Sequence, residues 1–348
     1  MVLKKITLRN FRNFIDSSFE FGSELTVIVG ENAKGKTNLL EAIFFLINGI
    51  GFRETKEIEL LNFASRGHAE VAGAFLEDGE IHDFKIVLAQ RGESVEKGYL
   101  VDKMRRRHYQ YAKEQTKAVL FTPQQIEMLT GSPEKRREYF NRLISFYDLE
   151  YKRRLDNYEQ ALRKRNRILE HHENLTKLQA ELSFWNDYLE EEASYVTKRR
   201  IEYADFLNKH PRIDAKTFQI EYQKNEFTRK KAQEIFAFET RIRRTAIGPQ
   251  KDDVQIYLDG KTKKNISRFG SRSEQRLTIL WLKMNEIAYH REIMKKDPIL
   301  LFDDVFSELD EKNRKIIFGL IKNHQTVATT TDKKILDLAK TPKKVIPL

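Results

Sequence analysis

Leu25–Asn38 reads LTVIVGENAKGKTN, an apolar, β-branched run followed directly by a glycine-rich loop. The loop fits the pattern G-x-x-x-x-G-K-[ST], and apolar residues at helical spacing follow it from Leu39 to Ile47. This order of strand, loop and helix is the context that a phosphate-binding loop requires. The glycines let successive backbone N–H groups and the helix N-terminus face a phosphate chain. The stretch therefore predicts a nucleoside triphosphate site.

Each residue of the loop has an expected part in that site. Lys36 would place a positive charge near the β and γ phosphates, and Thr37 would offer its hydroxyl to Mg²⁺. The residues expected to surround the nucleotide are Gly30, Glu31, Asn32, Ala33, Lys34, Gly35, Lys36, Thr37 and Asn38. A chance Gly-Lys-Thr turn is the alternative, and the flanking strand and helix patterns argue against it.

A second apolar run, Ile299–Phe302, ends in two adjacent acids. Asp303 is predicted to meet the Mg²⁺ that Thr37 holds, as a strand-end acid does in P-loop proteins. Asp304 lies one residue further on, where a carboxylate would polarise an attacking water molecule. Acids often end strands, so the pair is informative only together with the loop that begins at Gly30.

The composition excludes several other classes of protein. The chain has 348 residues and no cysteine, which rules out disulfide scaffolds, thiol nucleophiles and iron–sulfur clusters. Its apolar runs are too short for a membrane span, so we expect a soluble, cytoplasmic protein. The 63 Lys and Arg residues exceed the 52 Asp and Glu residues and give a net charge of +11. This excess favours a polyanionic partner, of which nucleic acid is the usual one.

The chain changes character twice along its length. Strand and helix patterns alternate up to the sequence Gly131-Ser132-Pro133-Glu134, and helical spacing then dominates to about residue 240. We expect two long helices there, over 140–168 and 175–201, folded back on each other as a hairpin. A mixed pattern resumes after residue 248. The predicted fold is α/β, with an ATPase head (1–130 plus 241–348) split by an inserted helical arm (131–240).

These segments together resemble one family, the RecF proteins of bacterial recombinational DNA repair, which belong with the SMC-like branch of the ABC-type ATPases. The resemblance rests on an ordered set of stretches: 4–14 (KKITLRNFRNF), 30–43 (GENAKGKTNLLEAI), 120–123 (LFTP), 131–137 (GSPEKRR), 248–253 (GPQKDD), 269–276 (FGSRSEQR) and 303–310 (DDVFSELD). The phosphate loop alone indicates only an NTPase, whereas the ordered set is specific and covers nearly the whole chain.

The resemblance implies how such a protein works. ATP and Mg²⁺ would bind at the loop of one subunit, with Arg12 and Asn13 near the base end of the nucleotide. Ser271, in the stretch 271–276 of a second subunit, would close over the γ-phosphate, and residues 307–310 would cross the dimer interface. The implied partners are double-stranded DNA near gaps or single/double-strand junctions, an ATP-dependent second copy of the chain, RecR with RecO, and indirectly RecA. The implied location is the bacterial nucleoid.

The stretch 271–276 departs from the family's usual Ser-x-Gly-Gln-Gln-Arg. Ser273 replaces a glycine, and Glu274 brings a negative charge that Arg272 is expected to offset. This departure leaves two functions open: a weak DNA-stimulated ATPase switch, or a nucleotide-gated DNA clamp with little or no hydrolysis. A P-loop kinase or small-molecule NTPase is a third hypothesis, which the split head and the basic arm disfavour.

A basic helix face is the candidate DNA contact. Its cations are Lys152, Arg153, Arg154, Arg163, Lys164, Arg165 and Arg167, interleaved with two tyrosines. Regularly spaced cations suit a duplex backbone, which offers phosphates rather than base edges. A solvated helix face is the alternative interpretation.

Overall fold

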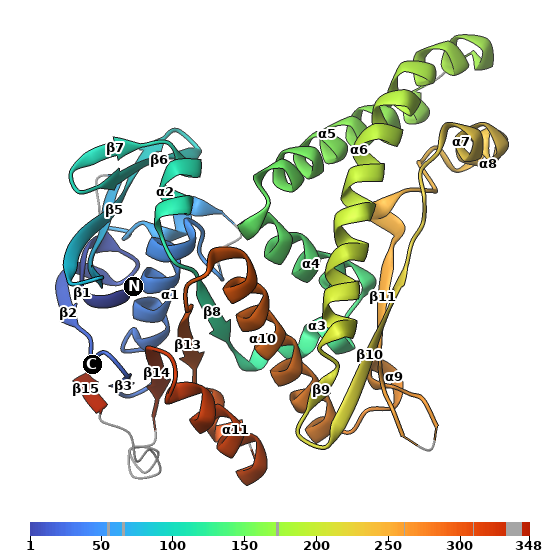
Figure 1. Ribbon diagram of the computed structural model, residues 1–348. Coiled ribbons are helices and arrows are strands. Elements are labelled where there is room, and N and C mark those ends of the chain that lie inside the picture. The colour runs from blue at the N-terminus through green and yellow to red at the C-terminus, as the bar shows by residue number, and fades with distance from the viewer. Residues whose placement is uncertain (54–55, 65–66, 172–173, 261, 309, 332–342) are drawn as a thin grey trace. The chain divides into compact units, whose positions relative to one another are not determined.

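The structure is a computed structural model that describes residues 1–348 apart from 54–55, 65–66, 172–173, 261, 309 and 332–342 (Figure 1). The chain forms two compact units. The first consists of Met1–Gln124 and Glu286–Leu348, and the second of Gln125–Asn285. The first unit contains the phosphate loop, and the second contains the long helices.

A parallel sheet in the first unit contains the strand that precedes the phosphate loop. Among the described residues its order is β15–β3–β14–β13–β8. The strands are β3 (Leu25–Val29), β8 (Ala118–Phe121), β13 (Ile299–Asp303), β14 (Thr326–Thr330) and β15 (Lys343–Pro347). Every residue of β3 is buried, as expected for a strand covered on both faces. Because all the pairings are parallel, the carboxyl ends of β3, β14 and β13 meet at one edge of the sheet.

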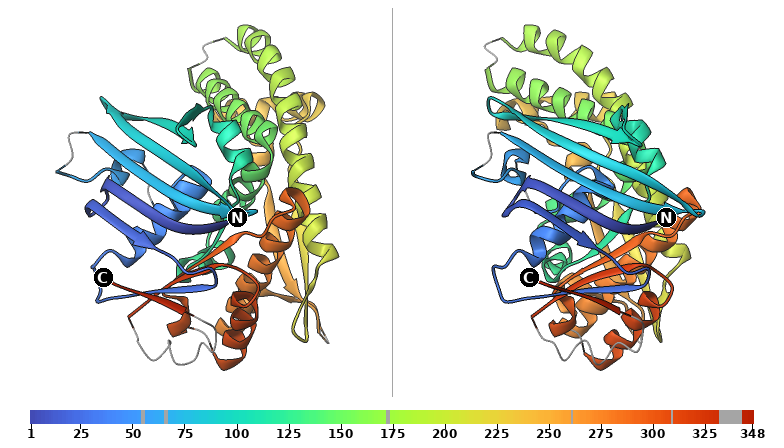
Figure 2. Two further views of the ribbon diagram at one scale, coloured as in Figure 1. Left: turned by 60° about the vertical axis from the view of Figure 1, so that its left-hand side comes forward. Right: turned by 90° about the vertical axis from the view of Figure 1, so that its left-hand side faces the viewer.

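An antiparallel sheet makes up most of the rest of this unit (Figure 2). Its order is β2–β1–β4–β5–β6–β7 in the part of the chain that is described. The strands are β1 (Val2–Phe11), β2 (Phe14–Glu20), β4 (His68–Glu77), β5 (Glu80–Arg91), β6 (Ser94–Val101) and β7 (Met104–Arg106). The turn between β1 and β2 carries Arg12 and Asn13 to the phosphate loop.

Helix α1 (Lys36–Asn48) contacts strands of both sheets. It is buried on every side from Leu39 to Asn48, because it supplies the core between the two sheets. Gly49, with a φ of 74°, ends it in the left-handed conformation that glycine adopts without strain. The remaining helices of this unit are η1 (Glu57–Leu60), α2 (His108–Glu114), η4 (Val305–Glu308) and α11 (Glu311–Ile321), and η2 (Pro123–Ile126) lies at the boundary.

The second unit is mainly helical. Its helices are α3 (Glu127–Thr130), α4 (Pro133–Tyr147), α5 (Leu149–His171), α6 (Leu175–Lys209), α7 (Arg229–Glu234), α8 (Phe236–Ile242), η3 (Pro249–Lys251) and α9 (Ile266–Phe269), and α10 (Arg272–Met294) begins in it. Helices α5 and α6 pack side by side (Figure 1). The segment expected to be one helix over 140–168 is two helices, because Asp148 is extended and its carboxylate accepts a hydrogen bond from the Tyr151 N–H at 2.9 Å.

The expectation of a helical arm over 131–240 is wrong between residues 212 and 223. Strands β9 (Arg212–Ile213) and β10 (Lys216–Gln223) lie there, and β10 pairs antiparallel with β11 (Asp253–Leu258), which pairs with β12 (Lys264–Asn265). Phe218 and Ile220 alternate with polar residues, so a period of two was present in the sequence. This pairing also explains why residues 241–285 fall in the second unit, whereas the sequence division placed them with the head.

The GPQKDD stretch at 248–253 anchors these elements to one another. The buried Asp252 accepts hydrogen bonds from Arg200 Nη1 at 3.0 Å and from the Asn225 N–H at 2.6 Å. Arg136 Nε lies 2.6 Å from Asp253. Gly248 has a φ of 118°, and a Cβ added there would clash with the Tyr158 hydroxyl. The stretch therefore ties α4, α5 and α6 to the start of β11, which is a structural role.

Candidate functional site

The backbone of the phosphate loop has two left-handed residues, of which only Gly35 is one of the glycines expected to shape it. Ala33 and Gly35 lie in the left-handed region, with φ values of 65° and 104°. A Cβ added to Gly35 would lie 2.5 Å from the side-chain amide nitrogen of Asn13, so another residue there would displace Asn13 in addition to adopting an unfavourable φ. Asn13 in turn accepts a hydrogen bond from Asn38 Nδ2 at 2.7 Å. The β1–β2 turn is thus packed directly against the loop.

Lys36 folds over the loop to which it belongs. Its ammonium donates hydrogen bonds to the Gly30 carbonyl at 2.8 Å and to the Glu31 carbonyl at 2.7 Å. The residue is 8% exposed, so the charge is held next to the loop backbone rather than in open solvent. Phosphate oxygens are stronger acceptors than these carbonyls, because a charged acceptor strengthens the hydrogen bond. The ammonium is therefore ready to exchange its carbonyl partners for phosphate.

Thr37 and Asp303 meet although 266 positions separate them. The Thr37 hydroxyl donates to Asp303 Oδ1 at 3.0 Å. The hydroxyl of Thr329, on the intervening strand β14, donates to the same oxygen at 2.9 Å and accepts from the Asp304 N–H at 3.0 Å. Asp304 has a φ of 51°, which turns the chain sharply at the end of β13. One buried threonine thus fixes both acids at the edge of the sheet.

These donors fit a magnesium ion. Mg²⁺ prefers oxygen ligands and is usually held by one or two protein groups together with phosphates and water. A hydroxyl and a carboxylate that already contact each other supply such a pair. Among the described residues no cluster of three or more His, Asp or Glu offers a cage made by the protein alone. Phosphate oxygens and water would supply the other ligands of the ion.

A buried carboxylate beside the loop was not foreseen from the sequence. Glu41, on α1, is fully buried and accepts hydrogen bonds from Arg12 Nε at 2.8 Å and Arg53 Nη2 at 3.2 Å. Burial by itself would raise the pKa of Glu41, but the hydrogen bonds and charges of the two arginines outweigh it and hold the pKa below its usual value. Arg53 also contacts the Asn38 side chain. The carboxylate therefore fixes Arg12 next to the loop. The position of Glu41 in the sequence, one helical turn after Thr37, could have indicated that it lies near the site.

The departure at Ser273 and Glu274 has a structural consequence. Glu274 Oε2 accepts from Lys264 Nζ at 2.7 Å and from the Ser271 N–H at 2.7 Å, and the Ser271 hydroxyl accepts from the Glu274 N–H at 3.3 Å. The Lys264 hydrogen bond, followed by the backbone one, lowers the pKa of Glu274 to about 2. Lys264, rather than the expected Arg272, offsets the acid. Glu274 and Ser271 thus form a reciprocal cap at the start of α10.

Some cations of the basic face on α5 are neutralised by ion pairs, and others are exposed to solvent. Arg153 pairs with Glu150 at 2.6 Å, and Arg154 pairs with Glu150, Glu191 and Glu192. Lys152, Arg163, Lys164 and Arg167 are exposed, with Arg163 4.0 Å from Glu159 and Lys164 5.0 Å from the centre of the Trp185 ring. The prediction is wrong for Arg165. That side chain is fully buried and paired with Glu239 at 2.6 Å, so it cannot reach a DNA backbone.

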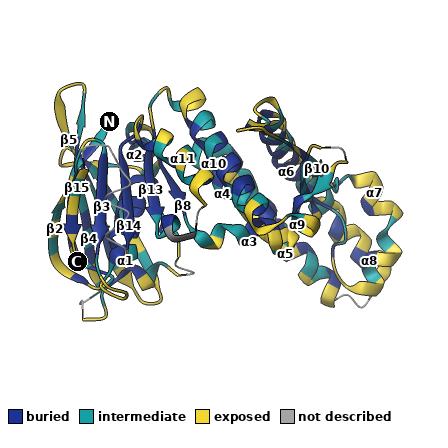
Figure 3. Cartoon of the chain, turned by 90° about the horizontal axis from the view of Figure 1, so that it is seen from below, coloured by how far each residue is buried: buried dark blue, intermediate teal, exposed yellow. Residues whose placement is uncertain are grey.

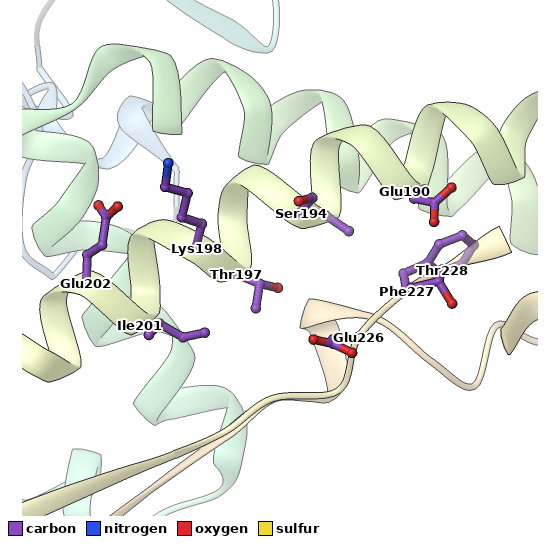
Figure 4. A pocket seen from close by; sticks show the side chains of 10 residues that line it. Glu190, Ser194, Thr197, Lys198, Ile201, Glu202, Glu226, Phe227 and Thr228 are labelled. Atoms are coloured by element: carbon purple, nitrogen blue, oxygen red, sulfur yellow. The ribbon is translucent and has the colours of Figure 1, made fainter. Parts of the chain in front are cut away.

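Several hollows lie in the second unit, and two of them are wide. A groove of about 680 Å³ between the end of α5 and the start of α6 is lined by Lys164, Arg167, Lys177 and Trp185 among others. A hollow of about 360 Å³ lies between α6 and residues 226–228 (Figure 4). The carboxylates of Glu190 and Glu226, which line this hollow, already accept hydrogen bonds from Arg229 and Lys231. Glu202, the third acid of this lining, pairs with Arg199, and none of the predicted site residues lines the hollow.

Two segments, at Ser271 and at 307–310, were expected to lie at a dimer interface. Ser271 belongs to the second unit, just before α10. The stretch 307–310 falls partly outside the described residues, at Leu309.

None of the described helices combines the length and the apolarity that crossing a membrane requires.

A parallel sheet with a phosphate loop after β3, a strand-end acid on β13 and a third strand between them defines the head of an ABC-type ATPase. The family model described as RecF/RecN/SMC N terminal domain matches residues 2–347. Together with the relatives described next, this match shows that the chain belongs to the RecF family, within the SMC-like branch of these ATPases.

Individual relatives cover most of the chain. A protein of Heliobacterium modesticaldum named DNA replication and repair protein RecF is 31% identical over 95% of this chain and 92% of its own. A protein of the same name from Acetivibrio thermocellus is 29% identical over 97% and 95%. The solved structure of the recombination mediator protein RecF-ATPrS in the RecFOR pathway matches with a TM-score of 0.83 and 26% identity, over 95% of this chain and 92% of that one.

Proposed function

We propose that this chain is an ATP-dependent DNA-binding protein of recombinational repair and replication maintenance. The observation that carries the proposal is the contact between Thr37 and Asp303 beside the folded-back Lys36. The relatives named as DNA replication and repair proteins, and the solved structure of the recombination mediator protein RecF-ATPrS, support the same function.

ATP would bind along the loop from Gly30 to Asn38. Backbone N–H groups of the loop and the N-terminus of α1 would receive the phosphates, and Lys36 would move from the Gly30 and Glu31 carbonyls to phosphate oxygens. Arg12 and Asn13 would lie toward the base end. Mg²⁺, held by Thr37 and Asp303, would neutralise charge that develops on the phosphates. Asp304 would orient and polarise the attacking water.

The head would work as a dimer. Ser271 of one subunit would close over the γ-phosphate bound by the other, so that the triphosphate bridges two heads and hydrolysis removes the bridge. DNA would lie against the open cations of α5, namely Lys152, Arg163, Lys164 and Arg167, with Arg153 and Arg154 at the edge. We further propose duplex DNA near gaps as the substrate, and RecR, RecO and RecA as the partners that follow from membership of the family.

The experiment is steady-state ATP hydrolysis by the whole chain, with and without duplex DNA, beside Lys36→Ala. Slow turnover that DNA accelerates and that the variant lacks is the expected result. Hydrolysis by Lys36→Ala at the rate of the original chain would refute the assignment of the site.

A second function is favoured by one observation, the cap between Ser271 and Glu274. Because this cap holds the negatively charged Glu274 carboxylate against Ser271, where a γ-phosphate would approach, the chain would act as a nucleotide-gated DNA clamp that binds ATP with little or no turnover. Tight ATP binding without hydrolysis would support the clamp, and Glu274→Gln would then be expected to restore turnover.

A further inference from the structure

Three arginines at the end of α8 form a basic cluster that the sequence division assigned to the head. Arg241, Arg243 and Arg244 are all exposed. The structure places them in the second unit, together with α5. Figure 3 shows α8 largely exposed at one end of that unit.

Buried polar contacts hold this cluster next to α5. Arg165 of α5 pairs with Glu239 of α8 at 2.6 Å, with both side chains fully buried. Arg165 Nη1 also donates to the Thr245 hydroxyl at 2.7 Å, and the Thr245 N–H donates to Asn166 Oδ1 at 2.9 Å. Contacts therefore fasten α5 to the chain on both sides of the three arginines. Their position relative to α5 is fixed by these contacts, even though α8 itself is short.

The charges of the cluster are not neutralised as those of Arg153 and Arg154 are. Glu239, the acid nearest in sequence, is engaged by Arg165. Within the described chain, neither Arg167 of α5 nor any of the three arginines forms an ion pair. Arg243 donates to the Glu170 carbonyl at 3.5 Å, and the exposed Glu170 carboxylate is the acid on this part of α5. A net positive surface results.

The cluster also has an apolar support. Phe238 and Ile242 are 45% and 43% exposed and lie one helical turn apart. The guanidinium of Arg241 lies 5.5 Å from the centre of the Phe238 ring. Stacking on a ring restricts the guanidinium without using its N–H donors, so they stay available for an anion.

We propose that Arg241, Arg243 and Arg244, together with Arg167, form a second phosphate-binding surface for duplex DNA, continuous with the face on α5. This inference rests on the proposed function and assigns residues to it. Guanidinium groups bind phosphate through paired N–H donors, which gives affinity without base recognition. The surface would therefore strengthen binding equally on different sequences.

The test uses the whole chain and a duplex of mixed sequence, with affinity measured by fluorescence anisotropy over a series of salt concentrations. Three variants are compared with the original chain: the α8 triple Arg241→Gln/Arg243→Gln/Arg244→Gln, the same positions changed to Lys, and a control triple Lys209→Gln/Arg212→Gln/Lys216→Gln. The control removes the same charge from exposed positions of the same unit, at the other end of α6, which is about 50 Å long.

The plot of log affinity against log salt has a negative slope. The Gln variant on α8 should reduce the magnitude of this slope by about 2 to 3, at roughly 0.9 for each phosphate that the variant no longer neutralises. The Lys variant should keep most of the slope, and the control should keep all of it. An unchanged slope in the α8 Gln variant, or equal reductions in that variant and the control, overturns the inference while the proposed function stands. If the original chain shows no salt-dependent affinity for the duplex, the proposed function itself is overturned.

Discussion

Removing the guanidinium of Arg165 should destabilise the second unit more than removing any exposed cation of the same helix. Arg165 makes hydrogen bonds to Asn186 at 2.9 Å, Thr245 at 2.7 Å and Glu239 at 2.6 Å, with its side chain fully buried. In Arg165→Met the methionine fills much of the space, but the Glu239 carboxylate loses its counter-charge and keeps the Ala246 N–H at 2.7 Å.

The expected decrease in the free energy of unfolding is about 3–5 kcal/mol, because a buried charge is left without a partner. Arg163→Met is the matched control. Arg163 lies two positions earlier, is 67% exposed and is 4.0 Å from Glu159, so its removal should change stability by about 0.5 kcal/mol or less.

Urea unfolding followed by tryptophan fluorescence measures this directly, because both tryptophans, Trp185 and Trp281, lie in the second unit. Arg165→Met combined with Glu239→Gln should be less destabilised than the sum of the single variants, since no buried charge remains unpaired. A cost below about 1 kcal/mol for Arg165→Met, or one equal to that of Arg163→Met, would refute the buried-pair reasoning.

Three further predictions concern the site and the DNA face. Thr329→Val should weaken Mg²⁺ binding in the presence of nucleotide by about tenfold, because the hydroxyl that orients Asp303 is removed, whereas Thr326→Val on the same strand should not; equal effects in a calorimetric titration would contradict the orienting role. Because the pKa of Glu274 is lowered, its carboxylate contributes its full stabilisation above pH 4.5, and this contribution is lost as the pH falls toward about 2. Thermal melts of Glu274→Gln over a series of pH values should lack this part of the acid dependence. A pH profile identical to that of the original chain would count against the cap. Changing Arg163, Lys164 and Arg167 to Glu should flatten the salt dependence of duplex binding. An unaltered slope would indicate that this face contacts only solvent.

Local patterns were sufficient for the phosphate loop and for the strand and helix on either side of it. The run Leu25–Val29 coincides with β3, because five consecutive apolar or β-branched residues before a glycine suit a strand buried on both faces. Gly35 is required by its own φ and by the approach of Asn13. The alternation in Lys216–Gln223 was equally local, and it was missed because the helical pattern on both sides dominated the interpretation. Boundaries such as Asp148 depended on one side-chain hydrogen bond, which periodicity does not register.

What the sequence determined by itself is the type of site: a loop that cradles phosphates, an acid at a strand end, and a basic chain that suits DNA. Tertiary structure decided which of these residues act together. Asp303 meets Thr37 because β13 and β3, the strand before the loop, lie on either side of β14, which supplies Thr329. Glu41 binds two arginines from separate loops. Arg165 and Arg167 look alike in the sequence, yet one is buried against Glu239 and the other is exposed. The physical reason is that burial and charge pairing depend on residues far apart in the chain, which only the packing of elements brings together.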